Sequence, residues 1–361
     1  MIVLVLILFF HFFLGFVIDN SKTKFMAYFF GFISLMITLL LTWGIKYTAD
    51  TEMYKVFYEI QWEDTDLMYF FLTKKFNQFG FSYFDLYKFY IVTYILLHYY
   101  LISRFNKNVF YIFLVYFILN YVQFVNQIRY YMAFPLFLLS LYFFIIEKKI
   151  ILAIIFTMLA FISHSAIALL YVFVPMFYFL NTKSYFKTVF VISGIVFLIV
   201  LALYQFGLAT YLEHFGEYFN SEMTSSFLGG LFNALPSVVY IIFLYILDKK
   251  YRMKYEYKND KYYQFISKLS FFTVIFIPSS FFIQVLGNRY VFPFLIIWVI
   301  HILYIIRNFS QQKKMIYFFT VFLINIFVGL LIYFMPSLII NSSFYYDELS
   351  EIIKSIDYLN G

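Results

Sequence analysis

Residues 188–205 read TVFVISGIVFLIVLALYQ and contain no charged side chain. A run of this length and composition is typical of a segment that crosses the hydrocarbon core of a bilayer. Such a segment is expected to be helical, because lipid offers the backbone N–H and C=O groups no hydrogen-bonding partner. Similar runs recur along the chain. We therefore predict an all-α fold, a polytopic helical bundle integral to a membrane.

The composition of the whole chain agrees with this class. Of its 361 residues, 64% are hydrophobic and 12% are charged, whereas a soluble domain carries about 25% charged residues. No cysteine is present, which excludes disulfides and thiolate metal sites. The sequence also lacks a P-loop, an EF-hand loop and an HExxH motif. ATP-driven transport by this chain alone is therefore not expected, and we predict no cofactor and no metal site.

Twelve spans are predicted, and they form a single transmembrane domain over residues 1–361. They cover roughly residues 2–18, 25–43, 86–103, 109–126, 130–146, 150–163, 165–180, 188–205, 231–247, 262–282, 290–306 and 315–335. The first is interpreted as a retained span rather than a signal peptide, because it lacks a basic region. Residues 150–180 have an alternative interpretation as one long tilted helix, but His164-Ser165 predicts a polar turn there.

The distribution of Lys and Arg predicts the orientation of the spans. Six alternate loops hold 17 basic and five acidic residues, whereas the rest of the chain holds nine basic and 14 acidic residues. These loops cover residues 19–24, 104–108, 147–149, 181–187, 248–261 and 307–314. They are predicted to face the cytoplasm, with both termini outside. The larger segments 44–85, 206–230 and 336–361 then lie outside, where a shaped site is expected.

Two arginines, Arg129 and Arg289, fall at outer ends of spans, whereas the other three fall on the cytoplasmic side. A guanidinium at membrane depth needs a partner, and its planar fork fits a phosphate or a carboxylate. The functional interpretation is that the two arginines bind a diphosphate, and the alternative is that they snorkel to the headgroups. Both lie in short polar motifs, whose other members are predicted to contact substrate: Asn126, Gln127, Asn288 and Tyr290.

Two residues are candidates for a catalytic general base. His164 follows a long apolar run, and histidine suits proton transfer or a phosphate contact. Its alternative role is a hydrogen bond between helices. Asp50 follows the second span and would take the proton of a sugar hydroxyl, unless it is a solvated loop charge or a helix N-cap.

Tyr54 is predicted to bind substrate. At helical spacing it shares one face with Tyr58 and Trp62. These aromatic rings would either stack on sugars or dock the segment on the membrane.

The remaining histidines show no sequence feature that points to a functional site. His11, His98 and His301 lie inside spans without matching polar neighbours and are interpreted as structural. His214 lies in an outer segment between Glu213 and Glu217, at no spacing that supports a metal site.

Three groups of residues, in this order, resemble the EpsG family of bacterial exopolysaccharide membrane proteins, which are similar to Wzy-type polysaccharide polymerases. The first is the acidic and aromatic segment around Asp50, Tyr54 and Phe57. The second is Asn126-Gln127-Ile128-Arg129 followed by Met132-Ala133. The third is His164-Ser165-Ala166, and Asn288-Arg289-Tyr290 is a related motif later in the chain.

The resemblance implies a nucleotide-independent glycosyltransferase at the outer face of the bacterial plasma membrane. It would transfer a glycan chain from undecaprenyl diphosphate to a hydroxyl of the next lipid-linked repeat unit. The product would be an O-antigen, a capsule or an exopolysaccharide. The implied partners are the lipid-linked oligosaccharide, the bilayer, a chain-length regulator and a flippase, with no nucleic acid.

Other functions stay open at this point. A transporter or flippase of lipid-linked oligosaccharide would use the same arginines, although the internal repeat common in transporters is not found in the sequence. Another lipid-linked glycosyltransferase or ligase is a second alternative. An acyltransferase would need a histidine with a neighbouring acid, and His164 has none nearby in the sequence.

Overall fold

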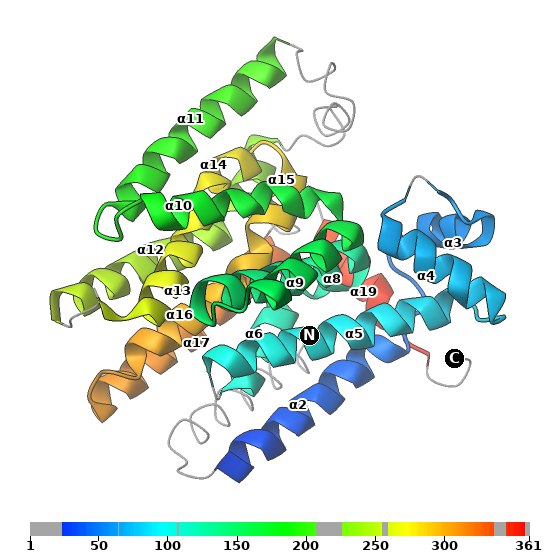
Figure 1. The fold of residues 1–361 in the computed structure, drawn as a ribbon, viewed down its shortest axis with the longest axis horizontal. Coiled ribbons are helices and arrows are strands. Elements are labelled where there is room, and N and C mark those ends of the chain that lie inside the picture. The colour runs from blue at the N-terminus through cyan, green and yellow to red at the C-terminus, as the bar shows by residue number, and fades with distance from the viewer. Residues whose placement is uncertain are drawn as a thin grey trace. The chain divides into compact units, whose positions relative to one another are not determined.

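The computed structural model describes residues 24–63, 65–106, 108–206, 226–254, 259–335 and 344–357. Within these ranges the regular elements are helices, which confirms the predicted all-α class (Figure 1). The chain divides into two compact units. The first comprises Met1–Tyr171 with Phe344–Gly361, and the second comprises Val172–Ser343.

Five helices in the described residues are long and apolar enough to cross a membrane. They are Ile128–Ile146, Tyr185–Leu203, Phe227–Met253, Gln284–Ile306 and Gln311–Tyr333. Each overlaps a predicted span, so the chain has the character of a membrane protein. The predicted count of twelve is not confirmed, and the span predicted at 2–18 lies outside the described residues.

Several of the other predicted spans are short or interrupted. Apolar helices of fewer than 18 residues cover Tyr28–Trp43, Ile150–Ser163 and Ser165–Phe179. The span predicted at 109–126 consists of α6 (Val109–Leu119) and α7 (Tyr121–Asn126). The span predicted at 262–282 also divides, because α13 (Lys261–Phe272) is followed by a short 3-10 turn and α14 (Ile277–Ser280).

The first unit is built around α5 (Tyr83–Phe105) and α8 (Ile128–Leu141). A capping box starts α5: Ser82 Oγ accepts from the Asp85 N–H, and the Asp85 carboxylate accepts from the Ser82 N–H at 2.8 Å. Almost every residue of α8 is buried. α2 (Lys24–Trp43), α6 and α9 (Ile150–Ser163) complete the apolar part of the unit.

The acidic segment 44–85 folds into α3 (Thr51–Ile60) and α4 (Leu67–Gln78), which both pack against α5 (Figure 1). Tyr54 and Tyr58 form the buried face of α3, and the Tyr58 hydroxyl donates to the Phe81 carbonyl at 2.6 Å. Trp62 does not share this face, because Gln61 adopts a left-handed conformation that ends the helix. The predicted three-residue aromatic face is therefore wrong, and its two tyrosines are buried within the protein.

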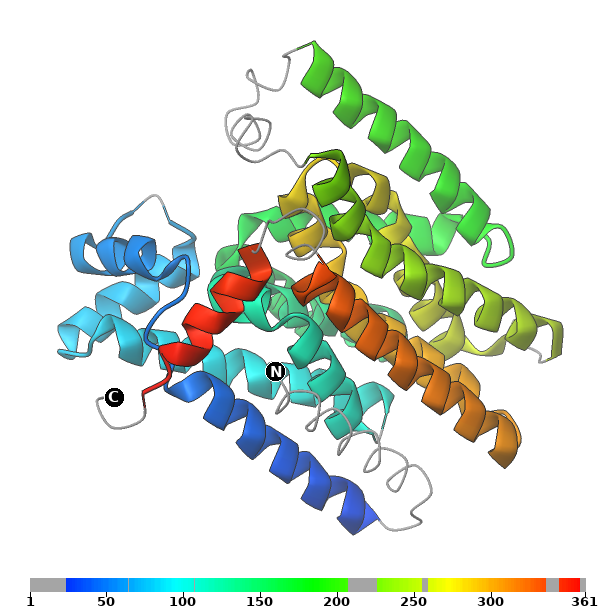
Figure 2. The same ribbon diagram turned by 180° about the vertical axis from the view of Figure 1, so that it is seen from behind.

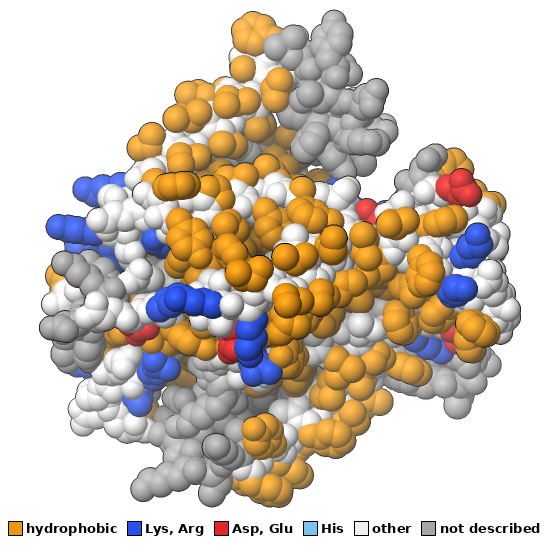
Figure 3. Space-filling model, in the orientation of Figure 1, with side chains coloured by type: hydrophobic (Ala, Val, Ile, Leu, Met, Phe, Trp, Pro, Cys, Tyr) orange, Lys and Arg blue, Asp and Glu red, His pale blue; other side chains and the backbone are white. Residues whose placement is uncertain are grey.

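The second unit is built around α16 (Leu295–Ile306), whose residues are all buried. It also contains α10 (Phe173–Phe179), α11 (Tyr185–Gln205), α12 (Phe227–Lys254), α13 and α17 (Gln311–Tyr333). Five large apolar side chains of α11 are exposed: Phe190, Val191, Ile195, Leu198 and Ile199. Hydrophobic side chains are likewise spread over the surface in Figure 3. Exposed apolar helix surface of this kind suits contact with lipid rather than water.

The polar motifs coincide with interruptions of the helices. Gln127 separates α7 from α8 with φ −88° and ψ 53°. His164 is extended, at φ −164° and ψ 117°, between α9 and a 3-10 helix over Ser165–Val172. The predicted polar turn at His164-Ser165 is thus confirmed, and the single helix over 150–180 is excluded. Broken helices at membrane depth often line substrate sites, because the interruption exposes backbone and side-chain polar groups.

Candidate functional site

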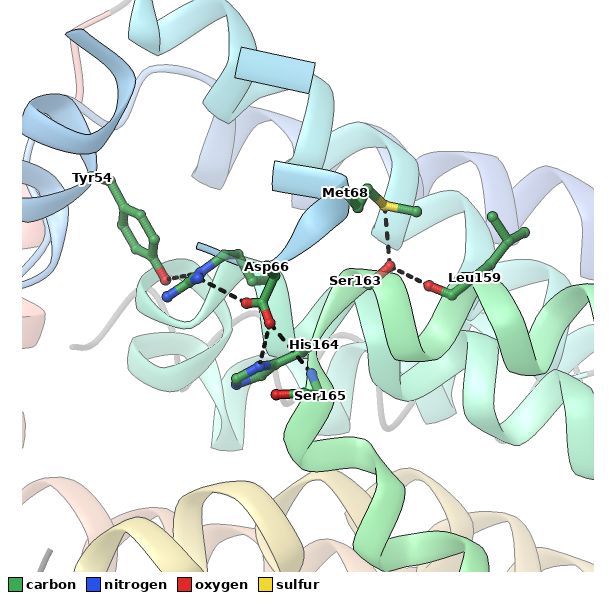
Figure 4. A network of polar contacts seen from close by, with 8 residues as sticks. Tyr54, Asp66, Met68, Leu159, Ser163, His164 and Ser165 are labelled. Atoms are coloured by element: carbon green, nitrogen blue, oxygen red, sulfur yellow. Dashed lines mark hydrogen bonds and ion pairs between the residues drawn. The ribbon is translucent and has the colours of Figure 1, made fainter. Parts of the chain in front are cut away.

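A largely buried carboxylate, Asp66, joins two of the predicted site residues (Figure 4). Its Oδ2 accepts a hydrogen bond from Arg129 Nη1 at 2.7 Å. Its Oδ1 lies 3.2 Å from His164 Nδ1 and accepts from the Ser165 N–H at 3.3 Å. The side chains of Asp66, His164 and Arg129 are 10%, 14% and 18% exposed. Each therefore remains accessible at its edge while most of it is desolvated.

Four separate elements supply this site. Asp66 precedes α4, Arg129 lies in the first turn of α8, and His164 lies at the break after α9. Tyr54 of α3 accepts from Arg129 Nε at 3.2 Å, so the predicted substrate-binding tyrosine is brought to the same place. The guanidinium also lies over the rings of Tyr54 and Tyr69, at 5.2 and 5.7 Å. These contacts fix its plane and direction.

The charges around Asp66 decide its protonation. Burial alone would raise the pKa of this carboxyl group, but the hydrogen bond from His164 and the charges of His164 and Arg129 outweigh it. The pKa of Asp66 consequently lies below its ordinary value. The carboxylate stays ionised at neutral pH, and its contribution to stability is lost only when the pH falls through that lowered pKa.

This arrangement has a clear chemical capability. An ionised Asp66 that accepts from Nδ1–H leaves His164 Nε2 as a proton acceptor, which is the orientation needed for a general base. Arg129 uses two of its five N–H donors in the described contacts with Asp66 and Tyr54. Its remaining donors can bind an anionic oxygen. A base and an anion-binding group thus share one carboxylate.

A comparison with known protein families identifies the family of this chain. The family model named EpsG family matches residues 26–347, which is nearly the whole chain. The chain belongs to the EpsG family. Its members are Wzy-type polymerases. No match was found among curated proteins or among solved structures.

Asp66 was missing from the sequence-based prediction for this EpsG-family chain, which named Asp50 as the catalytic carboxylate. Asp50 lies at the N-terminus of α3, one turn before Tyr54, and its side chain does not cap the helix. Its charge acts on Glu348 of α19 (Phe344–Lys354). The carboxylate that accepts hydrogen bonds from Arg129 and His164 is Asp66 instead. No local signal distinguishes Asp66 among the seven acidic residues of 44–85.

Asn126 and Gln127 lie three and two residues before Arg129. Asn126 Nδ2 donates to Glu348 Oε1, so the C-terminal helix contacts the polar motif of α7. α19 is drawn in red in Figure 2. Its end is held by Ser355, whose Oγ accepts from the N–H groups of Lys46 and Tyr47. Glu348 is a further residue of this region that the sequence-based prediction missed.

Arg289 belongs to the second unit. It lies in the last turn of α15 (Gln284–Tyr290) and is partly exposed. Its neighbours Asn288 and Tyr290 are buried, and the Tyr290 ring stacks on Phe276 at 5.1 Å. The predicted pairing of Arg289 with Arg129 on one diphosphate remains a prediction.

The second unit contains its own buried acid–histidine pair. Asp248 Oδ1 lies 3.2 Å from His301 Nε2, and Asp248 Oδ2 lies 2.8 Å from Arg252 Nε. The Tyr263 hydroxyl also donates to Asp248. The prediction that His301 lacks a polar neighbour is therefore wrong. Asp248 was also predicted in a loop, but α12 continues to Lys254 and buries it completely.

The other histidines add no group to the site. His98 is buried, and its Nδ1 lies 2.7 Å from the Tyr94 carbonyl of the same helix. This geometry agrees with its structural interpretation. His11 and His214 lie outside the described residues.

The docking of α19 is expected to depend on pH. Burial, together with the negative charges of Asp50 and Glu351, raises the pKa of Glu348 to about 7, although the Asn126 hydrogen bond lowers it. A carboxyl group raised this far costs on the order of 3 kcal/mol to ionise in place. Below the pKa of Glu348 in the unfolded chain, the docked α19 therefore has its full stability. This stability is lost as the pH rises through about 7.

Amide hydrogen exchange measures this effect. After correction for intrinsic rates, α19 should be less protected at pH 8 than at pH 5.5, and the difference should vanish in Glu348→Gln. Equal protection of the unmodified α19 at both pH values would show that the Glu348 carboxyl does not control its docking.

Proposed function

We propose that this protein polymerises a bacterial surface polysaccharide by joining lipid-linked repeat units. Membership of the EpsG family supports a polysaccharide polymerase. The observation that carries the mechanism is the carboxylate of Asp66 shared by Arg129 and His164. This carboxylate holds Arg129, which can bind a phosphate, together with His164, which can accept the proton of a hydroxyl group.

The reaction follows from these roles. The acceptor hydroxyl oxygen attacks the anomeric carbon of the growing chain, while His164 Nε2 takes the hydroxyl proton. The bond between that carbon and the diphosphate oxygen breaks, and the diphosphate leaves with the electron pair. Arg129 stabilises the developing negative charge without titrating. Asp66 holds both side chains in position and stabilises the imidazolium that forms. The energy comes from the glycosyl–diphosphate bond, so no nucleotide is needed.

The remaining parts of the proposal concern substrate and location. The carrier is undecaprenyl diphosphate, and Arg289 acts as a second contact for its phosphates, with Asn288 and Tyr290 beside it. The protein lies in the plasma membrane with about twelve spans, and the reaction takes place on the outer side. A flippase supplies the units from inside, and a chain-length regulator acts with the polymerase.

Two other functions remain to be tested. The contact between His164 and Asp66 supplies the histidine–acid pair that an acyltransferase would use. The guanidinium on the same carboxylate favours the polymerase, since an anionic leaving group needs a cation. A flippase would need the arginines to bind a diphosphate but would need no base.

Complementation distinguishes these functions. In a host whose own gene for this protein is deleted, the unaltered protein should restore long surface polysaccharide. Arg129→Lys and Arg289→Lys should leave single units outside the cell. Loss of the bidentate fork should reduce chain joining on the order of 100-fold. Levels of each variant in the membrane are the control.

Single units that accumulate inside would instead support the transporter. Wild-type behaviour of both variants would show that the arginines only snorkel.

A further inference from the structure

A second polar group precedes Arg129 in the sequence, where α7 ends, and it contacts α19. It consists of four buried acceptor oxygens, here called the acceptor cluster: Gln123 Oε1, Asn126 Oδ1, Gln127 Oε1 and Glu348 Oε2. None of them has a hydrogen-bond donor within the part of the chain that the structure describes. Buried acceptors are nearly always paired in folded proteins, so a group of four requires an explanation.

Three of these residues are close in the sequence, and a hydrogen bond joins the fourth, Glu348, to Asn126. Gln123 and Asn126 stand at positions i and i+3 of α7, which share one face of a helix, and Gln127 follows as the residue that ends α7. The Asn126 amide donates to Glu348 Oε1, so α19 covers that same face. Gln123 and Glu348 are 3% and 6% exposed. The cluster is therefore built from α7 and α19 together, although 222 residues separate Asn126 from Glu348.

The chemistry of the cluster selects its ligand. All four oxygens lack a donor, so the complementary ligand presents several O–H or N–H groups close together. A sugar ring presents such a set of hydroxyls. A divalent cation would favour several carboxylates, and the cluster contains one. The described residues also contain no group of three or more His, Asp or Glu side chains suited to a metal.

We propose that the acceptor cluster binds hydroxyl groups of a sugar in the lipid-linked repeat unit. The inference rests on the proposed function and adds a subsite to it. Glu348 accepts from two neighbouring hydroxyls, and the three amide oxygens accept from others. Arg129, two residues after Gln127, then holds the diphosphate of the same ligand. The C-terminal helix becomes part of the carbohydrate site rather than a tail.

The raised pKa of Glu348 agrees with this assignment. Ionisation of this buried carboxyl group is unfavourable while one of its oxygens, Oε2, lacks a donor. Hydroxyl donors from a ligand favour the ionised form and lower the pKa. Sugar binding should therefore supply the missing donors and lower the pKa of Glu348.

Equilibrium binding to the full-length protein in detergent tests the proposal with two probes. One is the host's own lipid-linked repeat unit, and the other is undecaprenyl diphosphate without sugar. Glu348→Gln should weaken binding of the sugar-bearing probe about tenfold and leave binding of the bare diphosphate unchanged. The matched control is Glu351→Gln, which alters an exposed carboxylate one turn later on α19. It should bind both probes as the unaltered protein does.

Several results would overturn the subsite. Equal weakening of both probes by Glu348→Gln would mean a general effect on the fold. Unchanged binding of both probes would mean that the cluster contacts no sugar. Loss of binding in EDTA would mean that a cation occupies it. Because the readout is binding, the subsite can stand even if no chain joining is found. It can equally fail while the protein still polymerises.

Discussion

Replacing Asp66 by Asn is expected to abolish chain joining. The amide keeps the size of the side chain but removes the negative charge that Arg129 and His164 share. His164 then loses the acceptor that directs its Nδ1–H, and Arg129 is left largely buried without a counterion. Loss of an orienting carboxylate lowers rates by at least about 1,000-fold in comparable acid–histidine pairs. The measurement is the rate at which membranes from a deletion host convert single repeat units to longer chains.

The same loop supplies the control for this prediction. Glu63 is exposed and lies three residues before Asp66, so Glu63→Gln removes a nearby charge without touching the site. It should keep the full rate. Asp66→Asn with normal membrane levels and an unchanged rate would refute the role of the shared carboxylate.

Replacing Asp248 by Ala is expected to destabilise the protein strongly. Arg252 and His301 would lose their shared carboxylate, and Tyr263 its acceptor. Removing one partner of a buried ion pair typically costs about 3–5 kcal/mol, because the other charge remains buried. The midpoint of thermal unfolding in detergent should therefore fall markedly.

Lys249→Ala is the matched control, since Lys249 is exposed and adjacent to Asp248 on α12. It should unfold near the wild-type temperature. Folded Asp248→Ala protein, assayed well below its midpoint, should still join repeat units, because Asp248 lies outside the proposed reaction site. Unchanged stability would show that the buried cluster does not brace α12, α13 and α16. Full stability with lost activity would give the cluster a catalytic role.

The residues that sequence could identify are those that contrast with their surroundings. Arg129 and His164 stand out because long apolar runs flank them; His164 lies at a helix interruption and Arg129 in the first turn after another. The same contrast explains the five long apolar helices that overlap predicted spans. The apolar run itself determines that a segment enters the membrane, so such a segment can be predicted without knowledge of distant contacts.

The residues that sequence missed depend on distant contacts. Asp66 pairs with residues 63 and 98 positions away, and it resembles every other acid in its segment. Asp248 begins a basic stretch that resembles a loop in the sequence. In the structure it is buried, and it contacts Tyr263 and His301 of two other helices. Glu348 lies in an acidic tail, and only its contact with Asn126 sets it apart. Local patterns cannot reveal such pairings.

Reconstitution tests the central claim most directly. The purified full-length protein would be placed in vesicles with the host's lipid-linked repeat units and no nucleotide, and the products separated by length. The account predicts a ladder of joined units with the unaltered protein, and only single units with Arg129→Lys or Asp66→Asn. Single units with the unaltered protein, particularly units that have moved across the vesicle membrane, would contradict it.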